Sequence, residues 1–130
     1  MSAIPKLRVV LADDTSEWRL MLRVILEQDG RFEVVGEAAN GQEAIAVTEQ
    51  QSPDAIVLDL AMPVLDGLQA IPSIRAASPA TAIVVLSGFA RGQLDREALE
   101  LGASAYVEKG EAFSLIASTL LESTAAADAA

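Results

Sequence analysis

The stretch DAIVLDLAMPVLDG, residues 54–67, decides the fold that we expect for this chain. Its first half, Ala55–Leu60, is a short continuous apolar run, which is typical of a strand buried on both faces of a parallel sheet. This run carries one carboxylate, Asp59, near its carboxyl end. The pair Asp66-Gly67 has the composition of a turn and helix cap rather than of a ligand, so a helix is expected to follow.

The same alternation of apolar runs and helical spacing extends over the whole chain. The predicted strands are Leu7–Ala12, Phe32–Glu37, Ala55–Leu60, Thr81–Ser87 and Ala105–Lys109. The predicted helices are Ser16–Gln28, Gln42–Gln51, Asp66–Ala77, Gln93–Leu101 and Ala112–Ser123. Five strand–helix units joined by crossovers predict an α/β domain built on a parallel sheet.

Local signals refine the expected helix ends. Asp29-Gly30 closes the first helix with a residue free to adopt a positive φ. Asp14 has an alternative structural role there, because Asp14-x-x-Glu17 resembles a capping box. Pro72 should kink the third helix or delay its start. Trp18 is expected to pack as part of the first helix, although its closeness to Asp14 could make its fluorescence report a bound metal.

Length and composition limit the domain and its chemistry. The chain has 130 residues, about one domain, with 1–124 expected to form it and 125–130 to be a disordered tail or linker stub. No cysteine or histidine is present, so disulfides, thiolate sites and imidazole ligands are excluded. Any metal must therefore be held by oxygen.

Charge and hydropathy limit the partners. The net charge of −10 repels phosphate backbones and anionic lipid, so we expect no nucleic-acid binding by this domain. The start of the chain has no long apolar segment, and no apolar run approaches the roughly 18 residues needed to span a bilayer. We expect a soluble, cytoplasmic protein without membrane contact.

Polar side chains follow the predicted strands where their carboxyl ends would share one edge of a sheet. They are Asp13, Asp14, Asp59, Ser87 and Lys109. Carboxylates about 5 Å apart repel by roughly 3 kcal/mol at an effective dielectric near 20, so a cation is needed. Mg²⁺ prefers such oxygens and often completes its shell with phosphate. A carboxylate beside Mg²⁺ can attack phosphorus to give an aspartyl phosphate.

Four sequence blocks together resemble the receiver domains of two-component response regulators. They are VVLADD at 9–14, IVLDLAMPVLDG at 56–67, VVLSG at 84–88 and GASAYVEKG at 102–110. The resemblance implies a flavodoxin-like fold with five helices and strand order 2-1-3-4-5. The segment VVGEAANGQEAI at 34–45 also resembles receivers attached to helix-turn-helix output domains, so the chain is expected to be a single-domain regulator or an excised fragment.

The resemblance assigns a role to each residue of the cleft. It implies Asp59 as the phosphoacceptor, with Asp13 and Asp14 positioning Mg²⁺ together with Asp59. The remaining roles are the backbone carbonyl of Ala61 as a further metal ligand, Ser87 as the hydroxyl that binds the phosphoryl group and acts in the switch, Lys109 as its cationic partner, and Tyr106 as the switch aromatic.

The resemblance also implies partners and a regulatory output. A sensor histidine kinase or a histidine phosphotransfer protein would supply the phosphoryl group, and the domain would catalyse only its own phosphorylation and autodephosphorylation. The surface formed by 93–101, 105–109 and 112–123 would change on phosphorylation. No basic residue follows Lys109, so the helix 112–123 cannot supply the cation for a charge-paired dimer across this surface. We therefore expect a monomer, with a phosphorylation-dependent dimer as the alternative.

One departure from the family pattern sets the main rival interpretation. Gly110 follows Lys109 where the family usually has proline, so a pseudo-receiver that binds partners without phosphorylation is the alternative function. A flavodoxin is disfavoured because Asp13 and Asp14 would repel a flavin phosphate. A phosphatase with an aspartyl nucleophile is disfavoured as well, because it would need a second acid two residues after Asp59, where this chain has Ala61.

Overall fold

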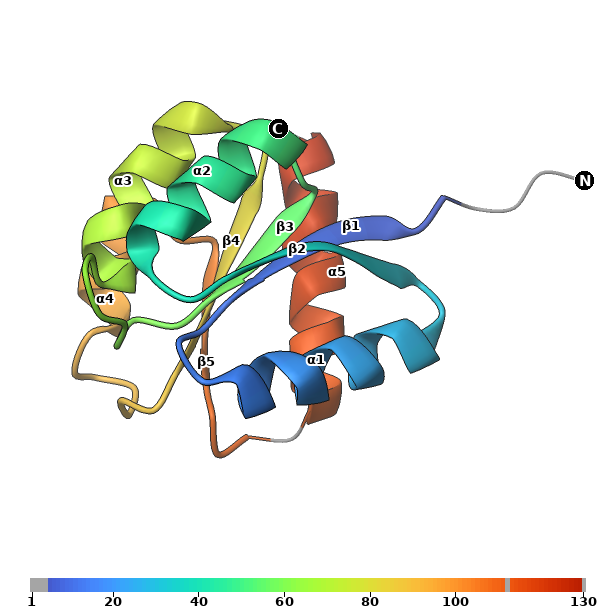
Figure 1. The fold of residues 1–130 in the computed structure, drawn as a ribbon, viewed down its shortest axis with the longest axis horizontal. Coiled ribbons are helices and arrows are strands. Elements are labelled where there is room, and N and C mark those ends of the chain that lie inside the picture. Colours follow the sequence, from blue (N-terminus) through green and yellow to red (C-terminus); the bar gives the residue numbers. More distant parts are fainter. Residues whose placement is uncertain (1–4, 112, 130) are drawn as a thin grey trace, which may run out of the picture.

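The structure, a computed structural model, describes residues 5–111 and 113–129. Its strands are β1 (Leu7–Ala12), β2 (Phe32–Ala38), β3 (Ala55–Leu58), β4 (Ala82–Ser87) and β5 (Ala105–Glu108). Its helices are α1 (Ser16–Asp29), α2 (Gly41–Gln51), α3 (Gly67–Ala77), α4 (Asp95–Leu101) and α5 (Phe113–Ala129). The strands form one parallel sheet in the order β2-β1-β3-β4-β5, which confirms the predicted fold (Figure 1).

Helices cover both faces of this sheet. Figure 1 shows α1 and α5 on one side and α2, α3 and α4 on the other. Because side chains alternate along a strand, Val9 and Leu11 of β1 pack with α1 and α5, whereas Val10 packs with α2 and α3. Strands β1, β3 and β4 lie inside the sheet with both faces covered, which explains their apolar runs Val9–Ala12, Ala55–Leu58 and Ala82–Leu86.

The helix ends follow local chemistry with one correction. Gly30 has φ 88° and donates its N–H to the Glu27 carbonyl, as the Asp29-Gly30 signal predicts. Asp66 caps α3, because its side chain accepts a hydrogen bond of 2.8 Å from the Gln69 N–H. The capping role of Asp14 is wrong, since the residue before α1 is Thr15 and no side-chain cap bond is formed there.

Two other predictions about the helices are tested by the structure. Pro72 does not delay α3, because the helix begins at Gly67 and contains it, packed through the fully buried Ile71 and Ile74. A kink at Pro72 stays a prediction. Helix α5 continues to Ala129, past the predicted end at Ser123, and so passes through most of the expected tail. The buried Thr124 hydroxyl bonds the Leu120 carbonyl, which satisfies that hydroxyl within the helix.

The remaining predicted ends agree with the structure within two positions, except that Ala112 lies outside the described residues. In the described part of the chain, we find no helix with the length and apolar character needed to cross a membrane.

Candidate phosphoacceptor site

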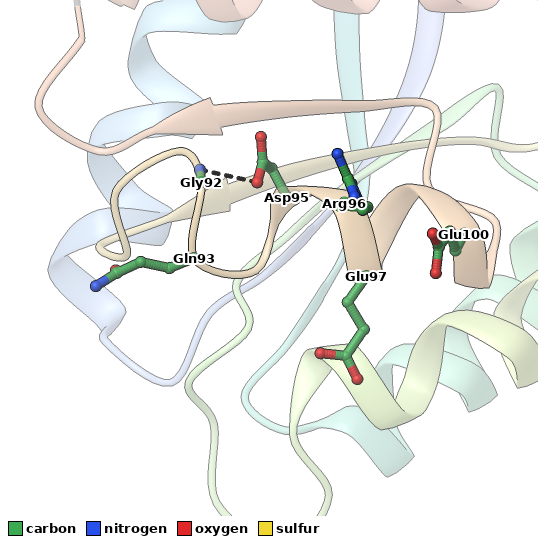
Figure 2. Close-up of a pocket in the computed structure, with 6 residues that line it drawn as sticks. All are labelled: Gly92, Gln93, Asp95, Arg96, Glu97 and Glu100. Atoms are coloured by element: carbon green, nitrogen blue, oxygen red, sulfur yellow. Dashed lines mark hydrogen bonds between the residues drawn. The ribbon is translucent and has the colours of Figure 1, made fainter.

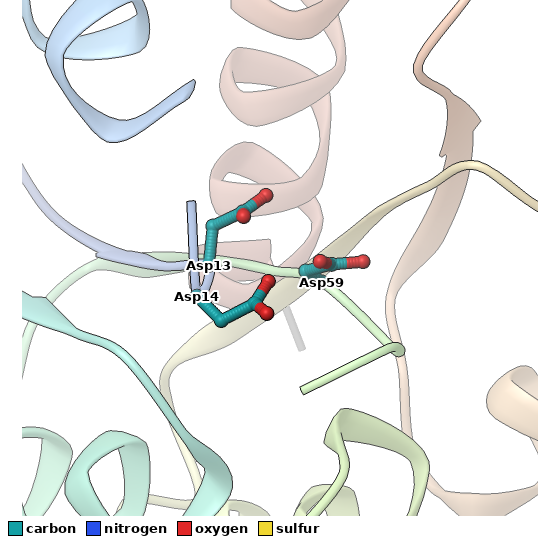
Figure 3. A group of neighbouring side chains, drawn as sticks. All are labelled: Asp13, Asp14 and Asp59. Carbon is teal, nitrogen blue, oxygen red and sulfur yellow. The ribbon is translucent and has the colours of Figure 1, made fainter. Parts of the chain in front are cut away.

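Three carboxylates converge at the carboxyl edge of the sheet, as predicted (Figure 3). Asp13 and Asp14 follow β1, and Asp59 follows β3, the strand that pairs with β1. Each offers an oxygen, and these oxygens lie within 4.8 Å of one another. Asp13 and Asp59 are only 3% and 4% exposed, whereas Asp14 is open to solvent. The cluster thus combines two buried acids with one that faces water.

Lys109 reaches this cluster from the end of β5. Its Nζ lies 2.8 Å from Oδ2 of Asp13 and 3.3 Å from Oδ2 of Asp59. The backbone N–H of Lys109 donates to the Ser87 carbonyl at 2.8 Å, which anchors the residue beside β4. All peptide bonds of the described residues are trans, and Lys109 nevertheless enters the cleft with Gly110 after it in place of proline.

The electrostatics leave the site in excess negative charge. Burial raises the pKa of the Asp59 carboxyl and the charge of Asp13 raises it further, against the opposing influence of Lys109 and the Ala61 N–H. Burial alone would lower the pKa of Lys109, but the hydrogen bond from its ammonium to Asp13 and the two carboxylate charges raise it. One ammonium cannot neutralise three acids. An all-oxygen donor set with a solvent-facing member fits a hard divalent cation such as Mg²⁺.

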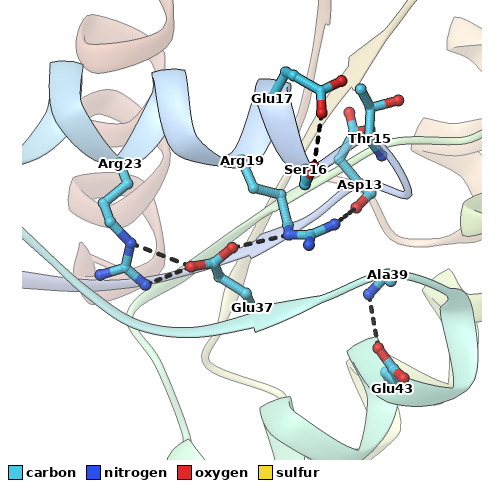
Figure 4. A network of polar contacts seen from close by, with 9 residues as sticks. All are labelled: Asp13, Thr15, Ser16, Glu17, Arg19, Arg23, Glu37, Ala39 and Glu43. Carbon is cyan, nitrogen blue, oxygen red and sulfur yellow. Dashed lines mark hydrogen bonds and ion pairs between the residues drawn. The ribbon is translucent and has the colours of Figure 1, made fainter.

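Arginines of α1 hold the backbone around Asp13 (Figure 4). Arg19 donates from Nη1 to the Asp13 carbonyl and from Nε to Glu37 on β2 at 2.8 Å. Arg23 binds the same Glu37 carboxylate at 2.6 Å. The Asp13 side chain is fixed as well, because its Oδ1 accepts from the Thr15 N–H at 2.9 Å. This network joins α1 and β2 to the turn that presents the acid pair.

The turn after Asp59 is fixed by a close backbone approach. A Cβ on Gly67 would lie 1.9 Å from the Asp59 carbonyl oxygen, so only glycine fits there. The Gly67 N–H donates to the Leu60 carbonyl, and the Ala61 N–H lies 3.3 Å from Oδ1 of Asp59. The proposed role of the Ala61 carbonyl as a metal ligand stays a prediction.

Ser87 and Tyr106 share one partner, the backbone of Phe89. The buried Ser87 Oγ accepts from the Phe89 N–H at 3.1 Å, and the Tyr106 hydroxyl donates to the Phe89 carbonyl at 2.8 Å. The Tyr106 ring is only 5% exposed and packs in the core beneath α2, α3 and α4. Sequence analysis missed Phe89, since nothing in the local pattern marks a loop residue whose backbone carries the contacts.

Trp18 adds a contact that the sequence also did not reveal. The Lys109 Nζ lies 4.8 Å from the centroid of the Trp18 ring. The ring centroid of Phe113, on α5, lies 6.1 Å from the ring centroid of Trp18. The expected packing of Trp18 against the core is confirmed. Trp18 and Lys109 are far apart in the sequence, so no spacing rule could have paired them.

A separate hollow of about 630 Å³ lies at the start of α4 (Figure 2). It is lined by Gly92, Gln93, Asp95, Arg96, Glu97 and Glu100. The Asp95 side chain accepts from the Gly92 N–H at 2.8 Å, so this carboxylate is engaged in shaping the loop. None of the predicted site residues lines this hollow.

The fold and the acid cluster define a receiver, and comparison with known families agrees. The sequence model described as response regulator receiver domain matches residues 9–120. The chain therefore belongs to the response regulator receiver domain family of two-component systems. Receivers of this family are phosphoacceptor signalling domains.

Curated relatives carry this domain within longer proteins. The chain is 47% identical over 105 residues to protein-glutamate methylesterase/protein-glutamine glutaminase 2 of Carboxydothermus hydrogenoformans, covering 80% of this chain and 30% of that protein. It is 39% identical over 108 residues to the transcriptional regulatory protein PdtaR of Mycobacterium tuberculosis, covering 83% of this chain and 51% of that one. The chain thus spans about a third to a half of these relatives.

Solved structures agree in fold. The signal receiver domain of the putative response regulator NarL from Mycobacterium tuberculosis has a TM-score of 0.88 at 29% identity, covering 93% of this chain and 98% of that one. The receiver domain of Thermotoga maritima CheB has a TM-score of 0.81 at 30% identity, covering 95% of this chain and 96% of that one. The same fold therefore occurs in the receiver of a response regulator and in the response regulator domain of CheB.

Proposed function

We propose that Asp59 accepts a phosphoryl group from a phosphohistidine on a partner protein. The observation that carries this proposal is the convergence of three carboxylates and the Lys109 ammonium at one edge of the sheet. Asp13, Asp14, Asp59 and the Ala61 carbonyl would hold Mg²⁺. The pseudo-receiver alternative is not favoured, because Lys109 contacts both buried acids despite Gly110.

The residues divide the work of the transfer. A carboxylate oxygen of Asp59 forms a bond to phosphorus while the phosphorus–nitrogen bond of the donor phosphohistidine breaks. The electron pair of the broken bond stays on the nitrogen of the departing imidazole. Lys109, already 3.3 Å from Asp59, offsets charge on the incoming phosphoryl oxygens. Ser87 uses its oxygen to accept from Phe89, so its own hydroxyl proton is available for a phosphoryl oxygen. Bound Mg²⁺ would supply further charge neutralisation and orientation.

The contacts of Phe89 suggest how the signal leaves the site. Ser87 holds the Phe89 N–H and Tyr106 holds its carbonyl, so both switch residues bind one peptide segment. When a phosphoryl oxygen recruits the Ser87 hydroxyl, that segment is expected to shift and change the Tyr106 contact. The surface of α4, β5 and α5 would then favour different partners by a population shift.

The proposed partner is a sensor histidine kinase or a histidine phosphotransfer protein in the cytoplasm. We propose that this receiver domain acts as a monomer, catalyses its own phosphorylation and dephosphorylation, and acts on no separate substrate. The relatives that carry such a domain include both methylesterases and transcriptional regulators.

Intact-mass spectrometry after incubation with acetyl phosphate tests this function. One added phosphoryl group is expected with Mg²⁺, and none without Mg²⁺ or in Asp59→Asn. Asp66→Asn is the matched control, because it makes the same chemical change at a helix cap that asparagine can also form. A folded wild-type protein that gains no phosphoryl group would favour the pseudo-receiver.

A further inference from the structure

The ammonium of Lys109 has a third neighbour besides its two carboxylates. The indole of Trp18 lies with its ring centroid 4.8 Å from Nζ, within the range in which a cation is attracted to an aromatic face. The Lys109 side chain is largely buried at this point. The attraction is therefore poorly screened by water, and tryptophan is the aromatic residue that binds cations best.

Trp18 is itself held in place. Its ring is tilted at 49° to the Phe113 ring at a centroid distance of 6.1 Å, a favourable arrangement for an aromatic pair. Both rings also pack against the core between the sheet, α1 and α5. The indole is thus a fixed surface rather than a mobile side chain, and α1 and α5 together determine where it lies.

The backbone of Lys109 is anchored, but it does not set the direction of the long side chain. Its N–H donates to the Ser87 carbonyl at 2.8 Å, and the turn is closed by the 3.0 Å bond from the Glu111 N–H to the Glu108 carbonyl. A Cβ on Gly110, the next residue, would meet nothing within 4 Å, so Gly110 makes no packing contact that would orient the lysine. A lysine has four rotatable side-chain bonds, and its orientation must come from the contacts of the side chain itself.

We propose that Trp18, braced by Phe113, is a positioning residue that holds the Lys109 ammonium at Asp13 and Asp59 for phosphoryl transfer. This inference rests on the proposed function for its kinetic consequence. Without the indole, Lys109 retains its carboxylate partners but gains access to other rotamers, so the ammonium meets the incoming phosphoryl group less often. Loss of the indole is therefore expected to lower the maximal rate of Asp59 phosphorylation by a larger factor than it raises the phosphodonor concentration that gives half of this rate.

The first test is independent of phosphorylation. The chain has two lysines, Lys109 and the exposed Lys6, so protein labelled with ¹³C-lysine gives two ε-methylene signals and its own reference. The ring current of Trp18 should displace the Lys109 signal from that of Lys6, and Trp18→Leu should bring the two together. A wild-type Lys109 signal at the position of Lys6 would overturn the proposal even in a protein that is phosphorylated normally.

The second test measures the rate of Asp59 phosphorylation by acetyl phosphate with Mg²⁺. Trp18→Leu is expected to lower the rate constant about 2- to 30-fold, the equivalent of about 0.5–2 kcal/mol of cation–π attraction. Trp18→Phe should recover most of the rate, and Leu20→Ala, an exposed position on α1, should leave it unchanged. Equal rates for wild type and Trp18→Leu, or equal losses for Trp18→Leu and Trp18→Phe, would overturn the proposal.

Circular dichroism must show that each variant is folded. Should Trp18→Leu fail to fold, Phe113→Leu takes its place, because it removes the brace and keeps the indole. A reduced Lys109 displacement and a slower rate in that variant would support the proposal, and no change in either would overturn it. A wild-type protein that takes no phosphoryl group would instead contradict the proposed function, while the ¹³C signals still decide whether Trp18 lies against Lys109.

Discussion

Replacement of Asp59 by asparagine should stabilise the protein. Asp59 is almost fully buried, with the carboxylates of buried Asp13 and exposed Asp14 within 4.8 Å and the Lys109 ammonium at 3.3 Å. At an effective dielectric near 20, the repulsion from Asp13 is about 3.5 kcal/mol and the attraction to Lys109 about 5 kcal/mol, and the water-screened charge of Asp14 adds to the repulsion, so the charge interactions nearly offset one another. Burying an ion costs several kcal/mol, and this cost decides the sign. We expect Asp59→Asn to raise the free energy of unfolding by about 1–3 kcal/mol at pH 7 without metal.

The pH dependence of this gain follows from the raised pKa of Asp59. The folded protein binds a proton at Asp59 more tightly than the unfolded chain, so the penalty is absent below the unfolded pKa of about 3.9. It develops as the pH rises from there through the higher folded pKa and is complete above it. Urea unfolding of both proteins from pH 3.5 to 7 measures the difference. An Asp59→Asn variant no more stable than wild type at pH 7, or a gain that does not shrink in acid, would refute this reasoning.

Substitutions at Gly67, Val64 and Tyr106, with Gly30 as a control position, test how the site is built. Gly67→Ala should lower the free energy of unfolding, measured in urea, by about 3 kcal/mol or more, because the new Cβ would lie 1.9 Å from the Asp59 carbonyl oxygen. Gly30 has φ 88° but open space around it, so Gly30→Ala should lower the free energy of unfolding by only about 1 kcal/mol. Val64 has φ 68° and a 74% exposed side chain. Val64→Gly should therefore raise the free energy of unfolding by about 0.5–1 kcal/mol, whereas Val64→Ala should leave it unchanged. A lower free energy of unfolding in the glycine variant would exclude backbone strain at this position. Tyr106→Phe should lose about 0.5–1.5 kcal/mol with the bond to Phe89, and unchanged stability would show that this bond contributes nothing.

Most of the fold was predictable because four of the five strands contain a continuous apolar run, whereas the edge strand β2 is interrupted by Glu33 and Glu37. In β1, β3 and β4 the run reports burial on both faces, and the end of each run places Asp13, Asp59 and Ser87 at the sheet edge. The extent of α5 was less predictable. The residues after Ser123 show no apolar period, yet alanine-rich sequence propagates a helix that packing has already started.

The site was predictable in its members but not in its contacts. The positions of Asp13, Asp14, Asp59 and Lys109 follow from strand ends, whereas the distances from Lys109 to two acids depend on a turn whose glycine leaves many conformations open. The partners of Trp18 and Tyr106 come from distant parts of the chain. Such contacts depend on how the layers pack, which local sequence does not encode.

Locating the phosphoryl group on the chain tests the central claim most directly. The protein would be incubated with Mg²⁺ and a phosphorylated histidine phosphotransfer protein, then treated with borohydride, which reduces an acyl phosphate to an alcohol. Peptide mass spectrometry would then identify the modified position. The account predicts conversion of Asp59 to homoserine and no change at Asp13, Asp14 or Asp66. A folded protein in which another residue is converted, or none is, would contradict the account.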